Sequence, residues 1–219
     1  MSILSFLRRA KTKGDHELAF WRGRHRVEGE LNHSHYEQFY TTTFGLSNVD
    51  YAGKNVLDIG CGPRGSLEWA DMAALRVGLD PLADAYRKLG SDQHRMTYVA
   101  APSESIPFAD AFFDVVTSFN SLDHVDDLPA TIAEIKRVTK VGGRLLLIVE
   151  INHPPTLTEP ITLRRELLHD LRPEFATDRA WECAMLAGQH NVYGSVLADR
   201  RATDPGEAGI LCAALTRVG

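Results

Sequence analysis

From residue 55 onward, short apolar runs alternate with segments whose apolar residues recur every three or four positions. The apolar runs predict strands at 56–59, 76–80, 97–100, 113–119 and 144–150. Between them, helices are predicted at 66–71, at 82–89, and from a cap at Asp126 or Asp127 to a stop at Gly142 and Gly143. Strands that alternate with helices are typical of a parallel sheet with crossover connections, so we expect an α/β fold.

Outside this region the pattern weakens. Residues 15–52 are polar, aromatic and rich in histidine, and they predict a series of short helical pieces. After residue 151 the spacing predicts a helix at 161–171, strands at 192–197 and 210–216, and a turn at 203–209. We therefore expect an N-terminal helical extension over residues 1–52, followed by one α/β domain over residues 53–219.

Composition limits the class of protein. The chain has 219 residues, of which 44% are apolar and 24% charged, as in an ordinary soluble domain. The apolar runs are too short to span a bilayer, and residues 1–9 lack the features of a signal peptide. Three scattered cysteines match neither a zinc spacing nor a disulfide framework, which points to a reducing cytoplasm.

The charge balance argues against a nucleic-acid partner. The formal net charge is −5, so the chain lacks the global positive field that nucleic-acid binding requires. Residues 21–26 form the one dense basic cluster, which we interpret as a solvated face or a contact to an anionic substrate.

The segment 56–65 carries the most specific signal. Its glycines at 60, 62 and 65 follow a buried strand with the spacing of loops that approach a nucleotide-like ligand. Phosphate-binding folds share this spacing. Asp58, however, precedes the turn, and a carboxylate there would repel a pyrophosphate. The acid favours a ligand that carries positive charge instead.

Residues 56–65 resemble motif I of class I S-adenosylmethionine-dependent methyltransferases, and three further motifs follow in the family's order through residue 150. The resemblance implies a Rossmann-like, doubly wound, mostly parallel seven-stranded sheet. It also implies S-adenosyl-L-methionine as cofactor and methylation of a small-molecule acceptor. In such a protein residues 1–52 would form a helical lid, and residues 151–209 would shape the acceptor site.

The resemblance assigns the cofactor site residue by residue. Asp58 would orient the methionine end, directly or through water, and the backbone of Gly60, Cys61 and Gly62 would pass beneath the cofactor. The alternative for the glycines is a strand-to-helix turn without a ligand.

The second strand ends in Asp80, where nucleoside-binding folds place an acid for the ribose hydroxyls. The next residue, Pro81, would touch the adenosine. Because Pro81 is in the favoured first helical position, Asp80 could instead cap a helix, and both roles can coexist.

The third motif departs from the family. Pro102 stands where family members often have an aspartate for the adenine amino group, so we assign adenine recognition to Ser103 and Glu104. Asn120 ends the fourth strand and would face the cofactor. Its alternative is a buried amide satisfied by loop backbone.

Methyl transfer requires alignment of two reactants, and it requires a base only where the acceptor must lose a proton. His124 would be that base, with Asp123 beside it, although a loop histidine without a catalytic part is the alternative. This base slightly favours an oxygen over a nitrogen acceptor.

The acceptor itself is assigned to polar and aromatic residues around the same sheet edge. Glu150 and His153 follow the fifth strand and would contact the acceptor, as would Tyr36 and Tyr40 from the N-terminal helices. We do not expect a metal, because these residues show no metal-ligand spacing.

Two other functions are compatible with these residues. One is a non-catalytic module that binds the cofactor and acts as a regulatory subunit. The other is a nicotinamide-dependent reductase, against which Asp58 argues, as does the absence of a Ser-Tyr-x-x-x-Lys pattern. Association into a homodimer is left open.

Overall fold

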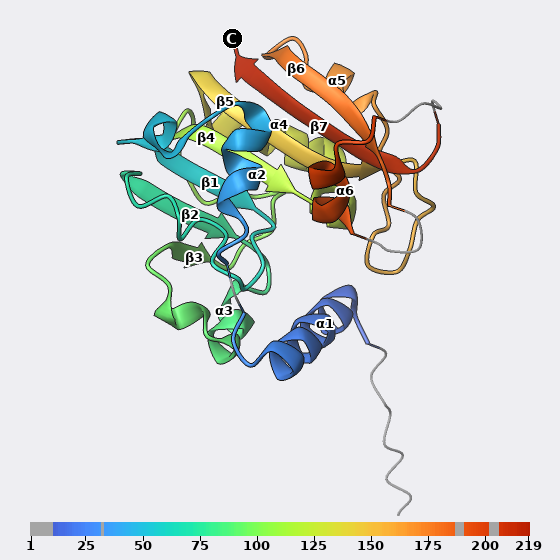
Figure 1. The fold of residues 1–219 in the computed structure, drawn as a ribbon. Helices are drawn as coiled ribbons and strands as arrows, with labels where there is room; N and C mark the ends of the chain where they lie inside the picture. Colours follow the sequence, from blue (N-terminus) through green and yellow to red (C-terminus); the bar gives the residue numbers. More distant parts are fainter. Residues whose placement is uncertain (1–10, 32, 187–190, 202–205) are drawn as a thin grey trace, which may run out of the picture.

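The computed structural model describes residues 11–31, 33–186, 191–201 and 206–219. Residues 1–9, which lack the sequence features of a signal peptide, lie outside the described residues, as do positions 203–205 of the predicted turn. Within the described part, seven strands form one sheet in the order β3-β2-β1-β4-β5-β7-β6 (Figure 1). Strand β7 runs antiparallel to β5 and β6, and the pairs among β1 to β5 are parallel. The predicted doubly wound, mostly parallel sheet is confirmed.

The strands span β1 Asn55–Ile59, β2 Leu75–Leu79, β3 Thr97–Val99, β4 Phe113–Phe119, β5 Thr139–Ile151, β6 Phe175–Ala184 and β7 Gly209–Arg217. The α-helices span α1 Lys13–Glu28, α2 Glu37–Tyr40, α3 Ala83–Tyr86, α4 Leu128–Val138, α5 Leu167–Asp170 and α6 Val192–Ala198. Short 3₁₀ turns lie at Thr42–Phe44, Asn48–Tyr51, Arg87–Leu89, Ser91–Gln93 and Leu122–His124.

A hydrophobic core lies on each face of the sheet. Along β5, Leu145 and Leu147 belong to one core, whereas Leu146 and Ile148 belong to the other, because successive strand side chains point to opposite faces. Helices α4 and α5 cover the first core, and α2 and α6 cover the second. Figure 1 shows α2 and α6 together in front of the sheet.

The N-terminal residues divide into two parts. Residues 36–51 pack directly on the second core through side chains such as Phe39 and Tyr51. Helix α1 lies beside α3 instead, where its Leu18 and Trp21 pack against Tyr86 (Figure 1). A capping box between Thr12 and Asp15 begins α1. The division into an extension and a domain at residue 52 stays a prediction.

Two predicted elements are wrong. Residues 66–71 form successive turns rather than a helix, as in the bond from the Glu68 N–H to the Gly65 carbonyl. Six residues are too few to sustain a helix without tertiary support. Residues 192–197 form α6 rather than a strand, because the Asn191 side chain accepts the Gly194 N–H and caps a helical turn.

The region after residue 151 contains two further differences. The helix predicted at 161–171 is reduced to α5, and the edge strand β6 was not predicted. Strand β6 lacks a regular polar and apolar alternation, because Asp178 and Arg179 interrupt it at a register shift against β7. No helix within the described residues is long and apolar enough to cross a membrane.

Candidate functional site

A cavity of about 620 Å³ opens where β1, β2 and β4 end, between the loops that follow them and helix α1. This is the edge of an open α/β sheet at which ligands bind, and the volume is in the ordinary range for ligand pockets. Eight residues that the sequence singled out line it: Gly60, Gly62, Asp80, Pro81, Ser103, Glu104, Asn120 and His124.

Asp58 lies beneath the β1 loop and is not among the lining residues. Its carboxylate accepts hydrogen bonds from the hydroxyls of Tyr40 (2.9 Å), Ser66 (2.5 Å) and Thr117 (2.6 Å). Burial raises the pKa of Asp58 to about 6, although these three hydrogen bonds oppose the shift. Asp58 therefore stabilises the region around the β1 loop through buried hydrogen bonds. Its contact to the methionine end of a cofactor stays a prediction.

The glycines of the loop are required by close packing. Gly60 has φ +72°, and a Cβ at this position would lie 2.2 Å from the Cβ of Ser121. Gly62 has φ +57°, and a Cβ there would lie 3.0 Å from the Trp21 ring of α1. Both backbones can approach their neighbours only without a side chain. Between them Cys61 turns away from the cavity, and burial raises the pKa of its thiol.

Asp80 combines the two roles that the sequence allowed. Its Oδ1 accepts the Leu82 N–H at 2.8 Å, as expected at a helix start, and its Oδ2 accepts the Gly62 N–H at 3.2 Å. The residue is 8% exposed, and burial raises the pKa of its carboxyl group. Because Asp80 also lines the cavity, a carboxylate with remaining acceptor capacity faces the ligand space. The ribose contact stays a prediction.

Ser103 and Glu104 lie on the cavity wall beside Pro102. The Glu104 carboxylate accepts the backbone N–H groups of Asp126 (2.7 Å) and Asp127 (3.0 Å), which ties the β3 loop to the start of α4. The Ser103 hydroxyl lies 3.0 Å from that of Thr131. The structure thus gives Glu104 a positioning role, while its contact to adenine stays a prediction.

Asn120 adopts a left-handed conformation at the end of β4, with φ +52°. Its N–H donates to the Ile148 carbonyl at 2.6 Å, but its buried Oδ1 has no hydrogen-bond partner among the described residues. The alternative of an amide satisfied by loop backbone therefore does not hold for this oxygen. A buried unsatisfied acceptor on a cavity wall is typical of a ligand contact.

Helix α1 contributes one wall of the cavity and lies within residues 1–52, which were expected to form a helical lid. Its action as a lid stays a prediction. Lys13, Glu17, Phe20 and Trp21 line the cavity, and Lys13 donates to the His124 carbonyl at 2.5 Å. The capping box at Thr12 indicates a helix start, but no sequence pattern indicates where that helix docks.

At its other end, α1 is held to the β1 loop. Glu28 binds Arg64 with oxygen–nitrogen distances of 2.7 and 2.8 Å. The Arg64 guanidinium also lies 5.6 Å from the centroid of the Trp21 ring. Side-chain contacts therefore hold α1 at both ends.

A second cavity of about 330 Å³ adjoins the first. The two share Phe20, Asn120 and Glu159, and Glu150 and Tyr193 line the second alone. Glu150 therefore lies where an acceptor could bind next to the larger cavity, as its assignment requires, and the contact itself stays a prediction.

Tyr36 and Tyr40, which were expected to face the pocket, line neither cavity. Tyr40 donates to Asp58, and the Tyr36 ring packs at 5.7 Å against Tyr193. These positions give both rings supporting roles behind the walls. A direct contact of either tyrosine with a substrate stays a prediction.

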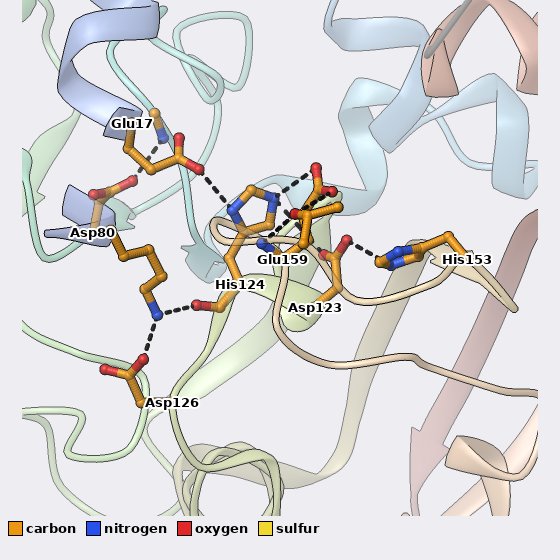
Figure 2. A network of polar contacts seen from close by, with 10 residues as sticks. Glu17, Asp80, Asp123, His124, Asp126, His153 and Glu159 are labelled. Atoms are coloured by element: carbon orange, nitrogen blue, oxygen red, sulfur yellow. Dashed lines mark hydrogen bonds and ion pairs between the residues drawn. The ribbon is translucent and has the colours of Figure 1, made fainter. Parts of the chain in front are cut away.

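Polar groups gather where the two cavities meet, as Figure 2 shows. The His124 Nδ1 lies 2.8 Å from Glu17, and its Nε2 lies 3.9 Å from both Asp123 and Glu159. Burial alone would lower the pKa of His124, but the hydrogen bond to Glu17 and the surrounding carboxylates outweigh burial and raise it.

Behind His124 lies a second histidine. The Nδ1–H of His153 can donate to the Pro154 carbonyl at 2.9 Å, and its Nε2 lies 3.4 Å from the Asp123 Oδ2. Asp123 is 1% exposed, and burial raises the pKa of its carboxyl group. The structure thus brings Asp123, His124 and His153 together, with Asp123 and His153 behind the cavity wall and His124 in it.

Comparison with known proteins agrees with this fold. Residues 57–147 match the sequence family described as a methyltransferase domain. The chain is 38% identical over 111 residues to a demethylmenaquinone methyltransferase of Thermobifida fusca, a match that covers 48% of this chain and 47% of that protein. It is also 38% identical over 91 residues to a malonyl-[acyl-carrier protein] O-methyltransferase of Pseudescherichia vulneris, which covers 41% and 36%. The chain spans less than half the length of these curated relatives.

Solved structures show the same fold at lower identity. A geranyl diphosphate C-methyltransferase from Streptomyces coelicolor, in complex with Mg²⁺, geranyl diphosphate and S-adenosyl-L-homocysteine, matches with a TM-score of 0.57 at 22% identity. That match covers 78% of this chain and 76% of the other. The [4+2]-cyclase SpnF matches with a TM-score of 0.56 at 23% identity, covering 78% and 77%. A shared fold does not determine the chemistry.

The sheet order, the glycine loop and the family match together define a Rossmann-like methyltransferase domain. The chain thus resembles the class I S-adenosylmethionine-dependent methyltransferases, with the family match confined to residues 57–147.

Proposed function

We propose that this chain binds S-adenosyl-L-methionine in the larger cavity and transfers its methyl group to a small-molecule acceptor. The observation that carries the proposal is the convergence of Gly60, Gly62 and Asp80 on one wall of that cavity. A close-packed glycine backbone next to a carboxylate suits a nucleoside ligand, whose ribose hydroxyls can donate hydrogen bonds to the carboxylate. The match of residues 57–147 to a methyltransferase domain favours S-adenosyl-L-methionine over a dinucleotide as that ligand. Curated relatives include methyltransferases of a quinone precursor and of an acyl-carrier thioester, both of which fit this reaction class.

The reaction needs the acceptor in line with the sulfonium methyl. As the bond from carbon to the acceptor atom forms, the bond from carbon to sulfur breaks, and the cofactor leaves as neutral S-adenosylhomocysteine. The second cavity adjoins the first at Asn120 and Glu159, so an acceptor in it would lie beside the cofactor space. Alignment of this kind is the main contribution that a protein makes to such a transfer.

An oxygen acceptor is favoured over a nitrogen acceptor. A hydroxyl must lose its proton as the new bond forms, and the polar cluster at the junction of the cavities contains the groups that can polarise or receive it. His124 lines the larger cavity, and the Asp123 Oδ1 lies 3.9 Å from the His124 Nε2. We assign this catalytic role to these two residues together.

Helix α1 is proposed to act as a lid over the cofactor. It lines the cavity opposite the β1 loop, and it is held there by side-chain bonds at both ends, through Lys13 and Glu28. Closure of α1 over the cavity would exclude water from the sulfonium. Because few contacts hold the helix, it would open again for exchange of cofactor.

The test is a calorimetric titration with S-adenosylhomocysteine and with an analogue that lacks both ribose hydroxyls. Asp80→Asn should weaken binding of the full ligand about 10- to 100-fold, because it removes the charged acceptor of those hydroxyls. The analogue should bind the wild type and Asp80→Asn about equally. Asp84→Asn, which changes an exposed carboxylate four residues away, is the matched control.

Two results would contradict the proposal. Binding of NADH or NADPH in place of S-adenosylhomocysteine would restore the reductase interpretation. An unchanged ligand preference in Asp80→Asn would remove Asp80 from the ribose contact. Tight binding without turnover on any quinone, phenol or acyl-thioester acceptor would instead favour the non-catalytic module.

A further inference from the structure

Three side chains from two segments place donor atoms around one point at the junction of the cavities. Asp123 and His124 lie in the turn after β4, and Glu159 comes from the segment after β5 (Figure 2). One ligand atom of each lies within 4.8 Å of the others. Bonds of about 2.0–2.2 Å to a tetrahedral metal would separate ligand atoms by roughly 3.3–3.6 Å. The two pairs at 3.9 Å therefore need to close by only a few tenths of an ångström.

The imidazole of His124 is oriented as a metal ligand. Glu17 accepts the Nδ1–H at 2.8 Å, which leaves the Nε2 lone pair directed towards Asp123 and Glu159. Histidines that bind metals almost always donate their other ring N–H to a carboxylate or carbonyl in this way. The Nε2 has no hydrogen-bond partner among the described residues, so its lone pair is available.

An independent observation comes from Asp123. This side chain is 1% exposed, and its Oδ1 is buried without a hydrogen-bond partner among the described residues. A buried carboxylate oxygen is costly unless a donor or a cation satisfies it. The same oxygen faces the His124 Nε2 at 3.9 Å. Both buried atoms lack a hydrogen-bond partner among the described residues, and a cation between them would satisfy both.

The charges around this point also favour a bound cation. Glu17, Asp123 and Glu159 surround His124, and His153 lies against the far oxygen of Asp123. The nearest ammonium, that of Lys13, pairs with Asp126 and with the His124 carbonyl. Carboxylates are therefore in excess at the junction, and a divalent cation would offset them.

We propose that Asp123, His124 and Glu159 bind a divalent transition-metal ion, of the Mn²⁺ or Zn²⁺ type. An imidazole combined with two carboxylates favours such ions over Mg²⁺ and Ca²⁺, which prefer oxygen ligands alone. The sequence did not indicate this site because Glu159 follows His124 by 35 positions.

The role of the ion in methyl transfer rests on the proposed function, whereas the existence of the metal site does not. His124 and Glu159 line the larger cavity, so the coordination positions that three ligands leave open would face the acceptor. An acceptor that binds the metal through an oxygen, such as a phenol or an enol, fits this arrangement. In that complex His124 would bind the metal instead of receiving the proton, and the metal would take over the polarisation of the hydroxyl.

The site is tested by titrating the full, metal-free chain with Mn²⁺ and following the free-ion signal by electron paramagnetic resonance, without cofactor. We expect one site per chain, with a ¹⁴N coupling from an imidazole in the pulsed spectrum. His124→Gln should abolish that coupling, and both His124→Gln and Glu159→Gln should lower affinity more than about 100-fold. Glu17→Gln, which removes the carboxylate behind the imidazole, should lower it about 10- to 100-fold.

Glu166→Gln is the matched control, because it changes an exposed glutamate that lines neither cavity. Thermal unfolding of each metal-free variant shows that it is folded. Failure of both Mn²⁺ and Zn²⁺ to bind the wild type, or binding that the cluster variants do not weaken, overturns the proposal. Since no cofactor is present, either result is independent of methyl transfer.

Discussion

Tyr40→Phe tests whether hydrogen bonds to the buried Asp58 carboxylate stabilise the fold around the β1 loop. The substitution removes the hydroxyl that donates to the Asp58 Oδ2 at 2.9 Å and leaves the ring in its packing against Phe119. A hydrogen bond to a charged group contributes about 1.5–3 kcal/mol to stability, and one to a neutral group contributes about 1 kcal/mol. The loss of unfolding free energy in Tyr40→Phe should therefore depend on whether Asp58 is ionised.

The sign of the pH dependence follows from the pKa of Asp58, which burial raises to about 6. The folded state binds this proton more tightly than the unfolded state, so Asp58 stabilises the fold at low pH. That contribution is lost as the pH rises from about 4 through 6. Asp80, whose charge also raises the Asp58 pKa, is present in both proteins and does not alter the comparison.

Removing the Tyr40 hydroxyl should raise the Asp58 pKa further, because one donor to the carboxylate is gone. We expect Tyr40→Phe to lose about 2 kcal/mol of unfolding free energy at pH 8 and about 1 kcal/mol at pH 5. Urea-induced unfolding at the two pH values measures both losses.

Tyr51→Phe is the matched control. The hydroxyl of this buried tyrosine donates to the Tyr40 backbone carbonyl, a neutral acceptor. Its loss should be about 1 kcal/mol at both pH values. An equal loss for Tyr40→Phe at pH 5 and pH 8 would refute the reasoning, because Asp58 would then not change its ionisation in this range.

Two further predictions concern the loop and the helix around the cavity. Gly60→Ala should unfold at a lower temperature than Gly53→Ala and should lose affinity for S-adenosylhomocysteine. Both glycines have positive φ, but only at position 60 does the new Cβ meet another side chain, at 2.2 Å; equal unfolding temperatures would contradict the packing argument. Glu28→Gln should speed hydrogen exchange in α1 by weakening its contact to Arg64, whereas Glu30→Gln, just beyond the helix, should not. Unchanged exchange in both would show that other contacts hold α1.

Local sequence patterns predicted the centre of the fold because its signals are local. The strands at 56–59 and 113–119 are rich in apolar residues, and the strand at 144–150 is the most apolar segment of the chain. Buried parallel strands need this composition on both faces. The predictions were wrong where tertiary contacts decide the structure. Residues 66–71 are held as turns by burial of Leu67 and by bonds to Glu68, and the edge strand β6 gains its partner only from β7.

The same division applies to the candidate site. Gly60, Asp80 and Asn120 could be chosen from the sequence because each directly follows a strand, and strand ends meet at one edge of a parallel sheet. Gly62 could be chosen from the glycine spacing of the same loop. The sequence also ordered these residues into the motif that marks the family. It could not show that Asp58 would be enclosed by three hydroxyls, since those come from residues 40, 66 and 117.

The sequence by itself thus determined the parallel strands of the sheet, the glycine loop and the resemblance to the methyltransferases, which depend on local spacing and on the order of short motifs. Only the tertiary structure decided that α1 lines the cavity, that Tyr40 binds Asp58, and that Glu159 lies beside Asp123 and His124. These contacts join segments up to 113 positions apart, as in the ion pair between Lys13 and Asp126. Their partners are selected by the shape and charge of the whole chain after it folds, and no local pattern records that selection.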